Sequence, residues 1–499
     1  MKSITLNLDN TAGESLYEQI YNQMKDSILT GRIEAGSRLP SLRRFSDENG
    51  VSVTTVEKAY NQLLVEGYVE SRPKSGYYVR NSIASEAQDN PEEERGMTLD
   101  QLLPPEGSHV GNEIPLLYDE ESFEFGRWKK CMHKVFNEYQ HLLRIAGDVQ
   151  GEPALRYEIA KYLFQSRGVK CSPDQVVIGA GSQQLTGHLC RILQEMEIAN
   201  AAAENPGYGP VREIFKEHGF TVLNIPVDEN GIVLEKLPTN MRSIVYVNPS
   251  NQFPTGAVMP VARRYALINW AKENDSYILE DDYDSELRYF GKPIPALQGL
   301  DHDDRVIYLG SFSSTLFEAV KISYMVLPES MVEVFHQFSS KYSQTCSNAE
   351  QICLALYMEE GFYQKKIKKC RKLYAGKLET TMREFGKAGK GKVTPVNSRS
   401  GLAVLLKIQT GLSPEHLCYI GRKLGLLILP VDDLCTREEQ AVTFYFYRVS
   451  NSLLKMLIPM FVKNIEREEK RMEQARLQEE KRKMMEEMEG KTYGLQRDE

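Results

Sequence analysis

The sequence lacks several features that would assign it to a class at once. It has no apolar run that approaches the roughly 18 residues of a membrane-spanning helix, so we expect a cytoplasmic protein. Its eight cysteines are scattered without CxxC pairs or Cys/His clusters, so neither a disulfide framework nor a metal site is indicated. It has no basic excess either: a formal net charge of -8 argues against a chain that coats nucleic acid everywhere, but leaves room for a local DNA-reading face.

The chain is long enough for more than one folded core. At 499 residues, with 41% hydrophobic side chains, it fits two or three domains. Four segments have patterns of their own, namely residues 11–80, 81–96, 97–465 and 466–499.

Residues 11–80 have the pattern of a winged helix-turn-helix. Apolar residues recur at helical spacing in a first helix, at Leu16, Ile20, Met24 and Ile28. Ser41 and Ser52 are expected N-caps of two further helices separated by an Asn-Gly turn. Residues 67–70 and 76–79 then predict a two-stranded hairpin with a basic tip.

This segment resembles the GntR family of bacterial transcription regulators through the run LPSLRRFSDENGVSVTTVEKAYNQLLVEGYVESRPKSGYYV. In such a fold the start of the last helix enters the major groove, while nearby basic side chains contact phosphates or guanine edges. The DNA contacts expected from this are Ser52, Thr54 and Thr55 on the helix, Arg43, Arg44 and Lys58 beside it, and Arg72 and Lys74 on the wing.

The charge of this module is balanced, because residues 11–80 carry nine basic and nine acidic side chains. DNA affinity must therefore come from an asymmetric placement of charge on the module. The alternative to a DNA-binding face is that the basic residues form an ordinary solvated surface. Val53 stands where family members often carry arginine, which predicts an unusual base preference. Residues 81–96 are polar and acidic without apolar periodicity, so they are interpreted as a flexible linker.

Residues 97–465 alternate between helical patterns and short apolar strands. Strands are expected at 176–178, 243–247, 277–279 and 306–309. This alternation predicts an α/β fold with a largely parallel sheet and a ligand site at the strand ends.

Three motifs follow expected strands. Residues 179–184, GAGSQQ, have the outline of a phosphate cradle, although such a turn is often a plain strand-to-helix connection. Residues 280–286, EDDYDSE, form an acidic cluster in which one buried carboxylate is suited to a protonated pyridine nitrogen; a solvated loop and a cation site are the alternatives. Residues 248–256 are a turn-rich loop that presents amides.

Together these segments resemble the aminotransferase-like domain of fold-type I enzymes that use pyridoxal phosphate (PLP), and specifically the MocR subfamily of GntR regulators. The matching runs are GDVQGEPALR, SRGVKCSPDQVVIGAGSQQ, ENPGYGPVREIF, NPSNQFPTG, EDDYDSELRYFGKPIPALQGLD, YLGSFSSTLF and GFYQKKIKKCRKLY. The resemblance implies a winged helix-turn-helix joined to this domain. It also implies PLP contacts from Gly181, Ser182, Gln183, Tyr208, Asn251, Asp281, Tyr283, Ser311, Ser313 and Lys321. In this set Asp281 faces the pyridine nitrogen and Tyr208 stacks on the ring.

Departures from the family pattern shape the expected function. Ser314 replaces the lysine that forms the Schiff base, and a hydroxyl cannot condense with the PLP aldehyde. Lys321 stands where an arginine usually holds the phosphate, and Glu318 replaces a common proline. Arg448 is a candidate for binding a substrate carboxylate.

The leading hypothesis is a DNA-binding regulator that acts as a homodimer and senses an effector through a catalytically inactive domain, with PLP bound noncovalently if at all. The alternatives are an active aminotransferase fused to a DNA-binding module and a purely structural dimerisation domain. Residues 466–489 are rich in charge without a heptad seam, which predicts a solvated single helix within a 466–499 tail.

Overall fold

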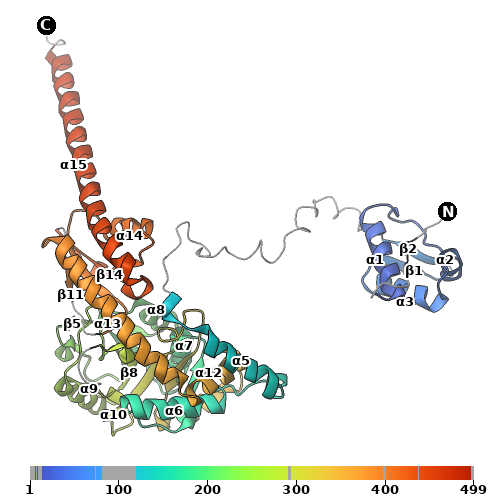
Figure 1. Ribbon diagram of the computed structural model, residues 1–499, viewed down its shortest axis with the longest axis horizontal. Helices are drawn as coiled ribbons and strands as arrows, with labels where there is room; N and C mark the ends of the chain where they lie inside the picture. The colour runs from blue at the N-terminus through green and yellow to red at the C-terminus, as the bar shows by residue number, and fades with distance from the viewer. Residues whose placement is uncertain are drawn as a thin grey trace. The chain divides into compact units, whose positions relative to one another are not determined.

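The computed structural model describes residues 6, 8, 14–73, 75–80, 120–289, 294–396, 400–436 and 438–495. The chain divides into two compact units, Met1–Glu106 and Gly107–Glu499 (Figure 1). The expected linker at 81–96, the first part of the 97–465 segment and Lys74 on the wing lie outside the described residues.

The N-terminal unit is a winged helix-turn-helix, as the sequence predicts. Its elements are α1 (Leu16–Leu29), α2 (Leu42–Asn49), α3 (Val53–Val65), β1 (Val69–Arg72) and β2 (Gly76–Val79). The Ser41 hydroxyl accepts a hydrogen bond from the Arg44 amide at 3.3 Å, and the Ser52 hydroxyl accepts one from the Thr55 amide at 3.1 Å. Gly50 ends α2 with a φ of 65°, in the left-handed region that favours glycine. Helix propensity and capping therefore set the local structure here.

The larger unit is built on a mixed eight-stranded sheet. Its strands are β3 (Val176–Gly179), β4 (Asn200–Asn205), β5 (Thr221–Asp228), β6 (Gly231–Ile232), β7 (Ile244–Val247), β8 (Tyr277–Asp282), β9 (Val306–Ser311) and β10 (Ser323–Val326). They follow the order β3-β10-β9-β8-β7-β4-β5-β6, in which the five strands from β9 to β5 are parallel to one another. The expected α/β fold with a largely parallel sheet is confirmed.

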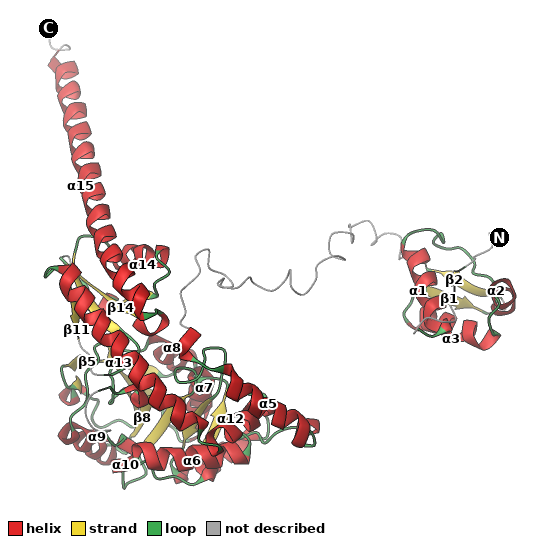
Figure 2. Ribbon diagram, in the orientation of Figure 1, coloured by secondary structure: helices red, strands yellow, loops and turns green. Residues whose placement is uncertain are grey.

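Helices cover both faces of this sheet (Figure 2). They are α5 (Phe125–Glu138), α6 (Pro153–Arg167), α7 (Ser182–Glu195), α8 (Gly209–Glu217), α9 (Val261–Glu273), α10 (Leu297–Leu300), α11 (Glu329–Ser339) and α12 (Asn348–Glu359). Alternate strand residues enter different cores: Val245 packs with α9, while Tyr246 packs with α7 and α8. This alternation follows from the two-residue period of a strand, and it explains why the central strands are apolar throughout.

A second, antiparallel sheet completes the unit. Its order is β11-β12-β14-β13, formed by β11 (Val393–Val396), β12 (Val404–Gln409), β14 (Glu439–Phe444) and β13 (Ile428–Pro430). The sheet shares a core with α13 (Phe362–Gly389), α14 (Pro414–Lys423) and the first half of α15 (Asn451–Leu495) (Figure 1). The sequence patterns did not predict this layer.

Helix α15 runs without a break through the expected boundary between residues 465 and 466. Ile465 is fully buried, whereas every side chain from 470 to 483 is exposed. The boundary thus marks a change in burial within one helix, because apolar residues stop recurring on its inner face. Within the described part of the chain, no helix combines the length and apolar character needed to cross a membrane.

Candidate functional site

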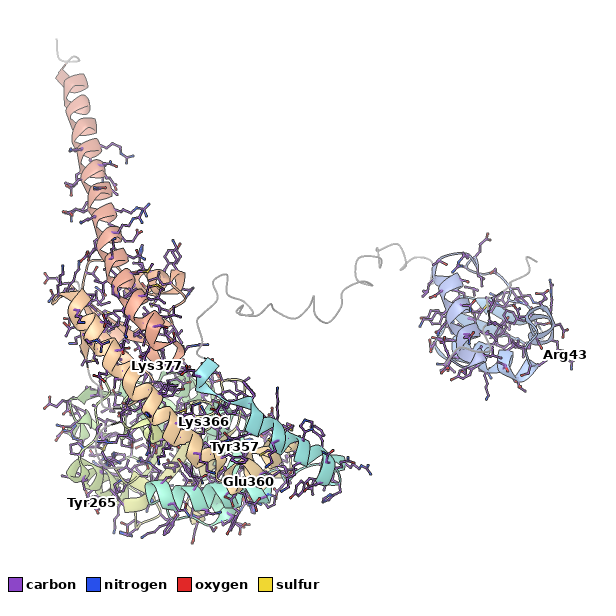
Figure 3. The ribbon with its side chains drawn as sticks, in the orientation of Figure 1. Arg43, Tyr265, Tyr357, Glu360, Lys366 and Lys377 are labelled. Carbon is purple, nitrogen blue, oxygen red and sulfur yellow. The ribbon has the colours of Figure 1, made fainter. Side chains whose placement is uncertain are left out.

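The first candidate site is the exposed face around α2 and the start of α3. Arg43, Arg44, Ser52, Thr54, Lys58 and Arg72 are exposed, and Thr55 is half-buried. Arg43 projects from the rim of the N-terminal unit (Figure 3). Arg44 forms an ion pair with Glu48 at 2.7 Å, and Arg72 pairs with Glu70 at 2.7 Å while its guanidinium lies over the Tyr78 ring. The structure therefore places the expected basic residues on the surface, with Arg44 and Arg72 oriented by acidic neighbours.

The start of α3 is organised around Ser52. Its hydroxyl lies 2.8 Å from the Thr54 hydroxyl and 2.7 Å from the Thr55 hydroxyl, in addition to accepting the Thr55 amide. Ser52 and Thr55 thus cap the helix, a role that fixes its first turn. Val53, 39% exposed, presents an apolar surface at the same turn. An apolar side chain there is suited to contact with a thymine methyl group.

The second candidate site is a cavity of about 580 Å³ at the carboxyl ends of the parallel strands. This is the edge at which α/β sheets bind ligands. The structure brings together there every residue that the sequence assigned to a cofactor, together with Ser314. These are Gly181, Ser182, Gln183, Tyr208, Asn251, Asp281, Tyr283, Ser311, Ser313, Ser314 and Lys321.

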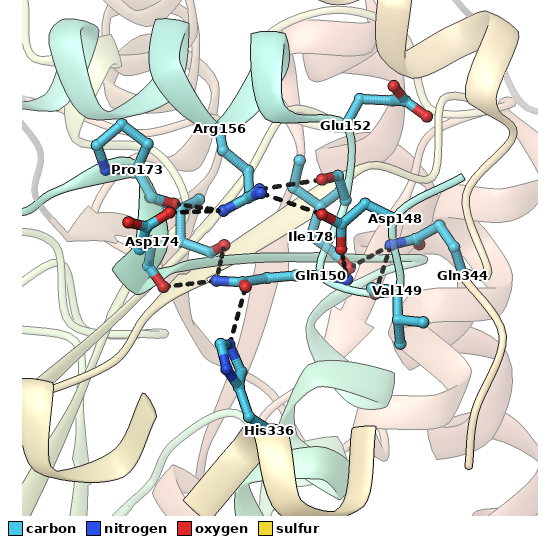
Figure 4. A network of polar contacts seen from close by, with 12 residues as sticks. Asp148, Val149, Gln150, Glu152, Arg156, Pro173, Asp174, Ile178, His336 and Gln344 are labelled. Carbon is cyan, nitrogen blue, oxygen red and sulfur yellow. Dashed lines mark hydrogen bonds and ion pairs between the residues drawn. The ribbon is translucent and has the colours of Figure 1, made fainter. Parts of the chain in front are cut away.

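A polar network anchors the start of β3, the strand that leads into the turn at Ala180 and Gly181. Arg156 on α6 donates to the carbonyls of Gly151 and Pro173 at 3.0 Å, and Gln150 donates to the carbonyl of Val176 at 3.0 Å (Figure 4). Gly181 then adopts a φ of 107° and begins α7. Because first-turn amides of a helix have no acceptor within the helix, this turn presents donors to an anion in the cavity.

Hydroxyls and one lysine occupy the strand end beside that turn. The Ser323 hydroxyl donates to the Ser311 hydroxyl at 2.9 Å, and the Ser313 hydroxyl donates to the Val320 carbonyl at 2.7 Å. Lys321 is exposed and is the one lysine that lines the cavity in the described portion of the chain. Hydroxyls, helix amides and an ammonium together suit a phosphate group.

Asp281 lies at the end of β8 and is only 7% exposed. The Tyr246 hydroxyl donates to its carboxylate at 2.6 Å, and Asn248 donates to its carbonyl at 3.0 Å. Burial raises the pKa of Asp281 to about 7, and the neighbouring Asp282 adds to this rise. A buried carboxylate that is costly to ionise alone is suited to a cationic ring nitrogen.

The opposite wall joins three segments. The Asn251 side-chain amide donates to the Asp284 carboxylate at 2.7 Å, and the Tyr283 hydroxyl donates to the Asn251 carbonyl at 3.2 Å. Gly401 has a φ of 85°, and a Cβ there would lie 2.4 Å from the Asn251 amide nitrogen. Burial raises the pKa of Asp284 well above its ordinary value. The acidic cluster is therefore buried, which excludes the alternative of a solvated loop.

Ser314 faces this wall. Its hydroxyl donates to the backbone carbonyl of Tyr283, one of the residues expected to contact PLP. The short Ser314 side chain leaves space in the cavity and provides no nucleophilic amine. No group of three or more His, Cys, Asp or Glu side chains within the described residues is arranged to hold a metal ion.

Comparison with known families matches both units. The family described as bacterial regulatory proteins, gntR family, matches residues 16–79, and the family described as aminotransferase class I and II matches residues 116–413. The probable rhizopine catabolism regulatory protein MocR of Rhizobium meliloti is 34% identical over 85% of this chain and 88% of its own. The chain belongs to the MocR subfamily of GntR-family transcription regulators.

Other relatives of this MocR-type regulator carry the same kind of name. The uncharacterized HTH-type transcriptional regulator YdeL of Bacillus subtilis is 39% identical over 86% of this chain and 91% of its own. The HTH-type pyridoxine biosynthesis transcriptional regulator PdxR of Corynebacterium glutamicum is 31% identical over 79% and 83%. A kynurenine aminotransferase of Pyrococcus horikoshii is similar in structure, with a TM-score of 0.62 and 22% identity over 76% of this chain and 98% of its own, which shows the fold of the larger unit.

The sequence analysis missed part of the cavity wall in this MocR-type regulator. Residues of the smaller sheet also line it, namely Leu402, Ala403, Leu405, Thr443, Tyr445 and Tyr447. Arg448, the candidate for binding a substrate carboxylate, does not line the cavity and instead lies 3.4 Å from the Glu318 carboxylate, which does. The run of bulky residues at 444–447 was visible in the sequence, but no periodicity placed it at the cavity.

A further buried carboxyl, that of Glu204, lies behind the site and predicts a pH effect on stability. Glu204 is 1% exposed, and burial raises its pKa to about 8. An unfolded glutamate loses its proton above about pH 4.3, whereas folded Glu204 keeps it up to about pH 8. The neutral Glu204 carboxyl therefore stabilises the folded state at low pH, and this stabilisation is lost as pH rises through about 8. We expect Glu204→Gln to be more stable than the wild type at pH 9, and the gap to shrink toward pH 5. Thermal unfolding at both pH values measures this, and a gap that grows toward pH 5 contradicts it.

Proposed function

We propose that this protein binds operator DNA as a homodimer through residues 11–80 and senses PLP, or a ligand held with PLP, in the cavity of residues 97–465 without covalent chemistry. The observation that supports this proposal is a cavity lined by all the residues expected to contact PLP, together with Ser314, which the resemblance assigns to the lysine position. A regulator that binds operator DNA acts where that DNA lies, which is the cytoplasm. On this proposal, residues 81–96 link the two parts and residues 466–499 form an accessory tail.

The cavity fits PLP by the chemistry of its donors and acceptors. Ser182, Ser311 and Lys321 line the cavity and would hold the phosphate, and Asp281, which also lines it, would face the ring nitrogen. Tyr208 presents its ring from the start of α8, at 6.3 Å from the Phe253 ring. When bound, PLP supplies an aldehyde and an electron-withdrawing ring. The chain's own residues hold and orient it, and Ser314 supplies no amine to bond with it.

The relatives support a link to vitamin B6 compounds. PdxR is named as a regulator of pyridoxine biosynthesis, and the kynurenine aminotransferase was solved in complex with PMP. The burial of Asp281 and its place in the cavity favour a ligand-binding role over a purely structural domain.

The alternative of an active aminotransferase needs a lysine beside Ser314. Lys321 is the lysine available among the described lining residues, and its place at the phosphate end favours charge neutralisation rather than bond formation. Catalytic inactivity is therefore part of the proposal.

Loss of a single basic side chain from the DNA face is expected to lower the affinity for DNA and to make that affinity less dependent on salt. Arg43→Gln and Lys58→Gln should each lower the slope of log affinity against log salt by about one, because each phosphate contact releases about one counterion. The measurement is fluorescence anisotropy of full-length protein on a duplex selected in vitro from a random library. Lys455→Gln removes the same charge from the larger unit, and an equal loss of slope in that variant would contradict the assignment of the face.

The same assay tests the proposed function. We expect addition of PLP to change operator affinity in the full-length protein. A protein that selects no duplex above background would refute the proposal, and so would one that binds PLP without any change in operator affinity.

A further inference from the structure

Glu318 is a carboxylate in the cavity wall that belongs to none of the PLP-type contacts. Glu318 lines the cavity, and its two oxygens have different partners. The Tyr447 hydroxyl donates to one oxygen, and the Arg448 guanidinium lies 3.4 Å from the other. Glu318 therefore occupies Tyr447 and Arg448, the two residues that would otherwise contact the carboxylate of a bound ligand.

The partners of Glu318 are fixed from behind. Tyr447 and Arg448 lie in a short helical turn at 446–448 that follows β14, and the Arg448 side chain is only 11% exposed. Lys377 on α13 is fully buried and donates to the Tyr447 carbonyl (Figure 3). Burial, and next the charge of Glu318, raise the pKa of Tyr447, so its hydroxyl remains a donor. This anchoring holds the arginine and the tyrosine against Glu318.

The remaining charges of the cavity favour a cation. Its described lining residues include three carboxyl groups, Asp281, Asp284 and Glu318, but a single basic side chain, Lys321. A ligand phosphate uses Lys321, which leaves the end near Glu318 without a lining cation. A carboxylate has about four acceptor positions, so Glu318 can accept further hydrogen bonds from a ligand. Its side chain is 55% exposed and is accessible from the cavity.

We propose that Glu318 is a built-in carboxylate that occupies Arg448 and Tyr447, so that this end of the cavity binds the ammonium group of an amine and excludes ligands that carry a carboxylate. The proposal rests on the proposed function, in which the cavity is the effector site. It names the effector class as an amine, such as a diamine, rather than an amino acid. A carboxylate ligand would have to displace Glu318 and would meet its charge in doing so.

Matched probes test the charge preference. The full-length protein, loaded with PLP, is titrated by calorimetry with 1,5-diaminopentane and with 5-aminopentanoate, and with 1,3-diaminopropane and 3-aminopropanoate. Each pair shares one amino end, so any contact of that end with PLP is common to both members. The difference in affinity reports the other end. We expect the diamine of at least one pair to bind about tenfold more tightly, as charge-assisted hydrogen bonds do.

Substitution of Glu318 should reverse this preference. In Glu318→Gln and Glu318→Ala, the diamine is expected to lose about tenfold in affinity, and the aminoalkanoate to gain because Arg448 and Tyr447 become available to it. Glu333→Gln removes an exposed carboxylate on α11 and should leave the ratio unchanged. Circular dichroism and thermal unfolding establish that the variants are folded.

Three results would overturn the proposal. They are aminoalkanoates that in both pairs bind the wild type at least as tightly as their diamines, a ratio that Glu318 substitution does not alter, and a PLP-loaded protein that binds no probe. Each of these leaves the PLP site itself standing. Failure of the wild type to bind PLP overturns the proposed function instead, so the two failures are distinguishable.

Discussion

Replacement of Ser314 by lysine is expected to give a protein that bonds covalently to PLP, whereas the wild type is expected to bind it without a covalent bond. The Ser314 hydroxyl faces the Tyr283 carbonyl at the cavity wall, where the resemblance to aminotransferases places the reactive amine. A lysine there has the length to enter the cavity, and a primary amine condenses with the aldehyde. After borohydride reduction, intact mass should show one phosphopyridoxyl group per chain, mapped by peptide mass to position 314.

The matched control adds a lysine outside the cavity. Ser340→Lys lies at the exposed end of α11 and should give no reducible adduct above that of the wild type. A folded Ser314→Lys protein that binds PLP but carries no adduct at position 314 would show that Ser314 does not stand at the lysine position. An adduct in Ser340→Lys of equal yield would show that the reaction is nonspecific.

Loss of the carboxylate at position 281 is expected to weaken PLP binding by about 10- to 100-fold, which is the value of a charge-assisted hydrogen bond in a buried site. Asp281→Asn keeps the size of the side chain and an acceptor for the Tyr246 hydroxyl, so the change reports charge. The measurement is a PLP titration followed by absorbance or calorimetry. Asp303→Asn, which removes a carboxylate that is paired with Lys272 and does not line the cavity, is the control and should bind as the wild type does.

The same substitution should stabilise the protein without ligand above neutral pH. Burial raises the pKa of Asp281 to about 7, whereas an unfolded aspartate has a pKa of about 3.9. The neutral carboxyl of Asp281 stabilises the folded state fully below about pH 3.9, and this stabilisation is lost as pH rises through about 7. Asn cannot ionise, so thermal unfolding at pH 8 should show Asp281→Asn to be the more stable protein. Unchanged PLP affinity together with lower stability at pH 8 would contradict the role of Asp281.

Local patterns in the sequence predicted the DNA-binding unit well. Ser41 and Ser52 cap their helices as expected, because capping depends on residues within one turn. What the sequence could not indicate was that the Ser52 and Thr55 hydroxyls face each other, which depends on rotamers. That contact orients both hydroxyls toward the helix start, where Ser52, Val53 and Thr54 are exposed and Thr55 is half-buried.

The cavity was predicted in part, for a physical reason. Residues that follow parallel strands converge at one edge of the sheet, so Gly181, Asp281 and Ser311 could be grouped from the strand pattern and the resemblance. The wall from the smaller sheet has no such rule, since β12 and β14 pair across a separation that includes α14 and β13. The contact between Glu318 and Arg448 joins residues far apart in sequence, and only the fold brings them together.

The measurement that tests the account most directly is PLP binding to the wild-type protein, followed by borohydride reduction and intact mass. The account predicts saturable binding with no phosphopyridoxyl adduct, because Ser314 provides no amine and Lys321 serves the phosphate. A stoichiometric adduct mapped to one lysine would contradict noncovalent sensing and restore the aminotransferase alternative.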